Sequence, residues 1–200
     1  KNCETKQGLF LGRVSLGVLN AVDQPFHDNN EHCMIVFHGE LYGSKASQND
    51  PAFVLQQYDE RGDKCVADLC GVFHFAIYDG RTSQLKLFSD KFGLQPLYYS
   101  ILPESIVFGA EVKAILQNRT VSRSPDYRSF ADFFHYGQIL GEKTLFRDVR
   151  LLEPGSVLTV NLDSGQSSLQ KYWTLDRLFA EKGAYDPEIS KEEVASLLAQ

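Results

Sequence analysis

Unlike charges occur at three places near the start of the sequence. They are Arg13, Glu40 and Asp50, and Gly39 directly precedes the glutamate. A guanidinium suits a carboxylate because two parallel N–H bonds fit its two oxygens, and a glycine lets the backbone approach a ligand closely. If these residues converge on one pocket, their unlike charges suit a zwitterionic ligand.

Each of these residues also has a structural interpretation. Arg13 could be a surface or strand-end arginine, and Asp50 precedes Pro51 as the N-cap of a helix would. Both interpretations of Asp50 can hold, because its two carboxylate oxygens can serve different donors. His38, just before Gly39, can donate one hydrogen bond as a neutral imidazole. It fits either an oxyanion donor or a satisfied histidine at a strand end.

Composition restricts the classes of function. Two hundred residues suit one sizeable domain, with a hydrophobic fraction of 43%. The net charge is −6 with no basic block, which argues against nucleic-acid binding, and no apolar run is long enough for a membrane span. Cys3, Cys33, Cys65 and Cys70 lack metal-ligand spacing, so we expect reduced thiols in a cytoplasmic protein and no metal site.

The stretch 69–99 predicts the element around which the domain is organised. Residues 72–78 are almost wholly apolar, β-branched or aromatic, which is typical of a strand covered on both faces. A turn begins at Asp79-Gly80, residues 85–88 return as a partner strand, and residues 97–99 form a third. The pattern therefore predicts a central three-strand meander with layers on both sides.

Further elements are predicted around this meander. A helix begins at Ser124-Pro125, with proline at its first position, and Tyr127, Phe130 and Phe134 form one apolar face of it. The remaining predictions are strands at 9–11, 14–19, 33–37, 106–108, 157–161 and 169–173, and helices at 50–62 and 111–117. Residues 174–187 look like a linker, and Ser190 with Glu193 forms a capping box ahead of a helix.

Several motifs together resemble a known family. Residues 71–79 read Gly-Val-Phe-His-Phe-Ala-Ile-Tyr-Asp, and residues 90–99 read Asp-Lys-Phe-Gly-Leu-Gln-Pro-Leu-Tyr-Tyr. With the blocks at 37–42, 108–116, 144–146 and 153–156, they resemble class II glutamine amidotransferase domains of the asparagine synthetase type. The blocks fall in family order over residues 13–173. The resemblance implies an α+β fold, a four-layer αββα sandwich of two mainly antiparallel sheets, spanning residues 1–173.

The resemblance also implies residue roles. Arg13 matches the arginine that pairs with the substrate α-carboxylate, and Glu40 and Asp50 match the partners of its α-ammonium. Gly39 matches the backbone donor to an oxyanion, and His38 stands where the family has an asparagine side chain. Two further departures are His74 in place of an alanine and Ser89 in place of an arginine. We interpret those two as changes in packing.

The nucleophile of the family is an N-terminal cysteine whose own α-amine acts as the base. Here residue 1 is Lys1, and Cys3 lies too close to Arg13 to leave room for the family's first strand and helix. We therefore assign no catalytic residue and interpret Cys3 as an ordinary thiol. We expect an amidotransferase-like domain without glutaminase activity that keeps part of a glutamine pocket. The alternative is an active glutaminase domain whose N-terminal segment is missing from this sequence.

The resemblance finally implies partners. An ATP-dependent synthetase domain would follow in cis, with residues 174–200 as its linker and first helix, and a homodimer is compatible with the family. The sequence contains no Walker phosphate loop and no Ser-Gly-Gly-x-Asp-Ser loop. We therefore expect no cofactor in this chain, and ATP with Mg²⁺ only in the synthetase domain.

Overall fold

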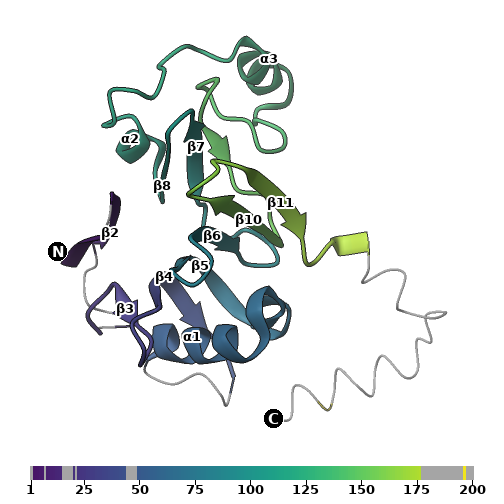
Figure 1. Cartoon of the computed structure of the whole chain (residues 1–200). Helices are drawn as coiled ribbons and strands as arrows, with labels where there is room; N and C mark the ends of the chain where they lie inside the picture. Colours follow the sequence, from purple (N-terminus) through teal and green to yellow (C-terminus); the bar gives the residue numbers. More distant parts are fainter. Residues whose placement is uncertain are drawn as a thin grey trace.

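The computed structural model describes residues 2–6, 8–14, 20, 22–43, 49–176 and 196 (Figure 1). None of the helices in this part of the chain is long and apolar enough to cross a membrane. The helices are α1 (Asp50–Arg61), the 3-10 helix η1 (Gly62–Asp68), α2 (Val112–Ile115) and α3 (Tyr127–Tyr136). The strands are β1 (Asn2–Lys6), β2 (Leu9–Arg13), β3 (Phe26–His27), β4 (Cys33–Leu41), β5 (Gly71–Asp79), β6 (Gln84–Ser89), β7 (Tyr98–Leu102), β8 (Ser105–Gly109), β9 (Arg150–Leu151), β10 (Ser156–Asn161) and β11 (Ser167–Lys171).

The described strands form three sheets. The largest has six strands in the order β11-β10-β6-β5-β4-β3, and a second has three in the order β8-β7-β9. Strands β1 and β2 pair with each other. Every pairing is antiparallel, so the fold is α+β with antiparallel sheets, which confirms that part of the prediction. The apolar run 72–78 forms β5 and lies in the interior of the largest sheet.

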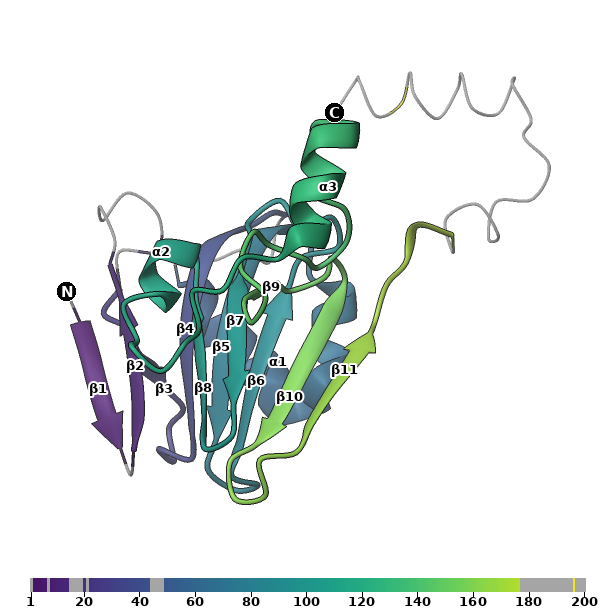
Figure 2. The ribbon, with the colours of Figure 1, turned by 90° about the horizontal axis from the view of Figure 1, so that it is seen from above.

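The predicted three-strand meander is wrong at its third strand. Strands β5 and β6 pair as expected, but β7 pairs with β8 and β9 in the other sheet. Asp90, directly after β6, explains the departure. Its carboxylate accepts hydrogen bonds from the backbone of Phe92, Leu94 and Gln95. These bonds curl the chain into a compact loop, and Figure 2 shows β7 in front of the largest sheet rather than beside β6.

Three apolar clusters follow from the alternation of side chains along the strands. Phe73, Phe75 and Ile77 of β5 point to the face covered by α1 and η1, where they pack with residues of β4 and both helices. Ala76 points the other way, into a cluster that combines β6 and β10 with β7 of the second sheet. A third cluster joins the second sheet to α2. Figures 1 and 2 show α1 on one face of the largest sheet and the second sheet on the other.

Two helix starts differ from the sequence prediction. In α1 the N-cap is Asn49, whose side chain accepts from the backbone of Ala52, so the carboxylate of Asp50 has no capping role. In α3 the N-cap is Asp126, which leaves Pro125 before the helix rather than at its first position. The helix ends at Gly62 and Gly137 are as predicted. The predicted strand at 14–19 lies, except for Val14, outside the described residues, as do most of the linker and the capping box.

Candidate functional site

The end of β4 and the start of α1 bring two predicted site residues together. Gly39 lies near the end of β4, and Asp50 begins α1 with only 4% of its surface exposed. Oδ2 of Asp50 accepts a hydrogen bond from the backbone nitrogen of Leu41 at 3.1 Å. Oδ1 is buried and accepts no hydrogen bond among the described residues. Buried carboxylate oxygens are normally paired, and Oδ1 is an acceptor that the described residues leave unsatisfied.

Asn20 connects these residues to Arg13. Its Nδ2 donates to the carbonyl of Gly39 and to Oδ2 of Asp50, both at 2.9 Å, and its Oδ1 accepts from the Asp50 nitrogen at 3.0 Å. Nη1 of Arg13 donates to the Asn20 carbonyl at 2.7 Å. The backbone of Asn20 has φ 47°, a left-handed conformation that asparagine tolerates better than most residues. Sequence reasoning missed Asn20, because nothing in its neighbours indicates a contact with Asp50.

The packing of β4 against β5 requires a glycine at position 39. Its φ is +110°, and a Cβ atom built there would overlap the carbonyl oxygen of Val72 and lie 2.8 Å from Cα of Phe73. The close neighbour is therefore strand β5 of the same sheet. The predicted approach to a ligand is a separate property that this geometry does not test.

His38 and Glu40 lie on either side of Gly39 along β4. The pKa of His38 is lowered, first by burial and then by the positive charge of Arg13. The imidazole is therefore neutral at neutral pH. The carboxylate of Glu40 accepts a hydrogen bond from the hydroxyl of Tyr42. Arg13, Gly39 and Asp50 thus share one hydrogen-bond network, whereas no contact observed among the described residues ties Glu40 to it.

The cysteines occupy other places. Cys3 lies in β1, where its backbone is opposite Gly12 of β2. Cys33 and Cys65 are buried, and burial is the main reason that the pKa of each thiol rises to about 12, so both are protonated at neutral pH. Cys70 is exposed before β5. The described residues contain no group of three or more potential metal ligands.

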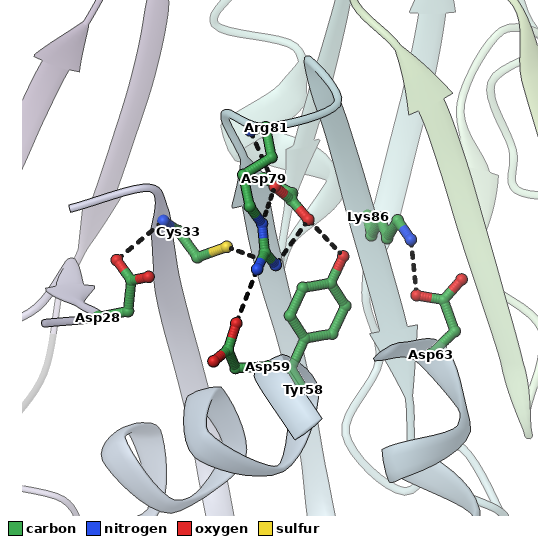
Figure 3. Close-up of polar contacts among 8 residues, drawn as sticks. All are labelled: Asp28, Cys33, Tyr58, Asp59, Asp63, Asp79, Arg81 and Lys86. Carbon is green, nitrogen blue, oxygen red and sulfur yellow. Dashed lines mark hydrogen bonds and ion pairs between the residues drawn. The ribbon is translucent and has the colours of Figure 1, made fainter. Parts of the chain in front are cut away.

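A second polar cluster anchors α1 at its far end (Figure 3). The hydroxyl of Tyr58 donates to Oδ2 of Asp79 at 3.1 Å, and Arg81 pairs with both Asp79 and Asp59. Nη2 of Arg81 also lies 3.3 Å from Sγ of Cys33. These contacts join the last turn of α1 to the β5–β6 turn. Helix α1 is therefore held at both ends, which fixes the position of Asp50.

Guanidinium, carboxylate and amide groups thus meet near the end of β4 in one hydrogen-bond network. The comparisons with known proteins agree with the motifs. Residues 2–173 match the glutamine amidotransferase domain family, so the chain belongs to that family. It is a class II glutamine amidotransferase domain related to asparagine synthetases.

The similar proteins include synthetases and amidases. The chain is 24% identical over 196 residues to asparagine synthetase [glutamine-hydrolyzing] 2 of Bacillus subtilis, covering 90% of this chain and 26% of that protein. It is 25% identical over 201 residues to amidase chyE of Penicillium rubens, covering 92% of this chain and 28% of that protein. Glutamine PRPP amidotransferase from B. subtilis matches with a TM-score of 0.46 and 16% identity, covering 76% of this chain and 32% of that one. The chain spans about a quarter of the length of the first two relatives.

Proposed function

We propose that this chain is an amidotransferase-like domain that binds glutamine or a similar amino acid without hydrolysing it. The observation that carries this proposal is the network of Arg13, Asn20, Gly39 and Asp50. Arg13 would pair with the α-carboxylate, and the unsatisfied Oδ1 of Asp50 would accept from the α-ammonium. Glu40, next to Gly39, is the second proposed ammonium partner.

The absence of hydrolysis is proposed from the chemistry of the thiols. A cysteine nucleophile of this class needs a free α-amine as its base. All four cysteines of the 200 residues are internal, so each of their nitrogens is part of a peptide bond. The thiols of Cys33 and Cys65 are also buried and protonated at neutral pH. An oxyanion pair of His38 and the Gly39 N–H would then polarise the ligand's side chain, and none of these four thiols would attack it.

Two measurements on the 200-residue chain test the proposal. Calorimetry with glutamine should detect binding that Arg13→Ala abolishes and that Arg119→Ala, at an exposed arginine, leaves unchanged. Ammonia release from glutamine should stay at background. Release that Cys3→Ser abolishes would instead make Cys3 the nucleophile and favour the active glutaminase. If the chain shows neither glutamine binding nor ammonia release, a structural module is the remaining function.

The same proposal extends to layering and partners. The three apolar clusters support a four-layer αββα sandwich, with α1 outside one sheet and α2 outside the other. The chain matches only 26% of the Bacillus subtilis synthetase and 28% of the amidase chyE, which supports a further domain in cis, and we propose a synthetase domain as that partner. ATP and Mg²⁺ would act in that domain.

A further inference from the structure

Three departures from the family pattern form one row across the largest sheet. His38 of β4 lies opposite His74 of β5, and His74 lies opposite Ser89 of β6. Cross-strand partners on adjacent strands contact each other on the same face of a sheet. The sequence shows three isolated changes, but the register makes them neighbours. A shared position indicates one remodelled surface rather than three independent changes in packing.

The two histidines are in direct contact. Their rings stack with centroids 5.0 Å apart and an angle of 25° between planes. His74 is 8% exposed, so its ring forms a buried support for His38. On the far side of His74, the small side chain of Ser89 is buried and donates to the carbonyl of Glu153 at 2.6 Å.

Gln95 contacts both rings. Its backbone carbonyl lies 3.4 Å from Nδ1 of His74, and its side chain hydrogen-bonds His38. A carbonyl oxygen only accepts, so the contact with His74 places the ring proton on Nδ1. Gln95 is itself fixed, because its backbone nitrogen and that of Leu94 donate to the buried carboxylate of Asp90. The bridge between the two histidines is therefore rigid.

Burial is the main reason that both imidazoles are neutral. The pKa of His74 is lowered to about 4, first by burial and then by His38, although the Gln95 carbonyl and the charge of Asp90 oppose this shift. Burial and Arg13 lower the pKa of His38, and the Gln95 side chain opposes them. A neutral imidazole has one donor and one acceptor nitrogen, and a hydrogen bond to one nitrogen decides the role of the other.

We propose that His74 and Gln95 are positioning residues that orient the His38 imidazole toward the network of Arg13, Asn20, Gly39 and Asp50. There His38 hydrogen-bonds the side-chain end of the bound amino acid. The ligand contact rests on the proposed function, whereas the orientation of the ring does not. The position of His38 directly before Gly39, within reach of the charge of Arg13, supports this direction.

The orientation is tested by nuclear magnetic resonance of histidine rings in isotopically labelled protein. Gln95→Leu removes the side-chain hydrogen bond to His38 while nearly keeping the volume of the side chain. The ring nitrogen chemical shifts of His38 should then move from those of one tautomer toward those of a mixture of tautomers, and the pKa of His38 should fall. Gln117→Leu, at an exposed glutamine, should change nothing, and His135 on α3 serves as an internal reference. An unchanged tautomer of His38 in Gln95→Leu would overturn the positioning role.

The ligand contact is tested by titrating the labelled protein with glutamine. The His38 ring signals should shift, and His74→Ala should weaken binding about tenfold, the effect of losing one well-oriented hydrogen bond, whereas His135→Ala should not. Binding that depends on Arg13 but leaves the His38 signals unmoved would overturn this inference and leave the proposed function intact. If glutamine does not bind, the proposed function and the ligand contact both fail, and Gln95→Leu still decides the positioning role.

Discussion

Asn20 and Asp50 exchange two hydrogen bonds across thirty residues of sequence. Nδ2 of Asn20 donates to Oδ2 of Asp50 at 2.9 Å, and the backbone nitrogen of Asp50 donates to Oδ1 of Asn20 at 3.0 Å. The pair connects the first residue of α1 to the segment that carries Arg13. Because Oδ2 of Asp50 is engaged in this way, Oδ1 is the carboxylate oxygen that the described residues leave unpaired.

We predict that Asn20→Ala destabilises the domain by about 1–3 kcal/mol, because the carbonyl of Gly39 and the buried carboxylate of Asp50 both lose a donor. Glutamine binding should weaken in parallel, since Asp50 loses its orientation. Urea unfolding and calorimetry measure the two effects. Asn29→Ala, in the exposed turn before β4, should stay within about 0.5 kcal/mol of the wild type. Equal stability of the two variants would contradict the structural role of Asn20.

Gly39 should be far less tolerant of substitution than Gly137. Both have a positive φ, +110° and +73°, but a Cβ at Gly39 would overlap the Val72 carbonyl, whereas nothing lies within 4 Å at Gly137. Gly137→Ala should therefore cost about 1 kcal/mol from backbone strain alone. Gly39→Ala should lower the free energy of unfolding by at least twice that amount, because β4 and β5 must also separate. Thermal unfolding of the two variants measures the difference, and similar melting temperatures would refute the steric argument.

Local sequence patterns predicted much of the fold. The apolar run of β5 was identifiable because Gly71 and Asp79-Gly80 bound it on both sides. The placement of β7 in the second sheet was not predictable. The turn before β7 depends on the buried carboxylate of Asp90, which accepts several backbone hydrogen bonds at once. That is a tertiary contact, which neither periodicity nor turn propensity encodes.

The residues of the candidate site were predictable only where they belong to a recognisable sequence motif. Arg13, Gly39 and Asp50 came from motif matches, and the structure places them in one network, although their roles toward a ligand stay predictions. Asn20 had no motif. The contact between His38 and His74 required the register of β4 on β5, and a shift of one residue would have put the two side chains on opposite faces.

The pH dependence of stability should reveal the cluster at the far end of α1. Burial raises the pKa of Asp79, but the hydrogen bonds from Arg81 and Tyr58 lower it by more than burial raises it. The net shift is therefore downward from 3.8. A carboxyl with a depressed folded-state pKa stabilises the protein above its unfolded pKa and loses that contribution as the pH falls through its folded pKa. The contribution of the cluster should therefore be complete near neutral pH and decline below about pH 4.

Tyr58→Phe tests this by removing the hydroxyl that donates to Asp79. We expect a loss of about 1–2 kcal/mol at pH 7 that shrinks at pH 3. Tyr172→Phe is the matched control, because its hydroxyl donates at 2.7 Å to the uncharged backbone carbonyl of Ser89. Its effect should be the same at both pH values. Urea unfolding at each pH gives the comparison, and parallel pH profiles for the two variants would rule out the carboxylate as the cause.

The aromatic side chains of α3 should contribute little to stability, although their spacing resembles that of a core-facing helix. Phe134 is 82% exposed and Tyr127 74%, whereas Phe75 on β5 is fully buried among other phenylalanines. Exposed apolar surface gains almost nothing on folding, whereas a buried phenylalanine loses both its transfer free energy and its packing when truncated. Phe134→Ala should therefore change the free energy of unfolding by less than about 0.5 kcal/mol, and Phe75→Ala should lower it by about 3–5 kcal/mol. Denaturant unfolding of both variants measures this contrast. A loss for Phe134→Ala approaching that of Phe75→Ala would mean that α3 packs against the domain in solution.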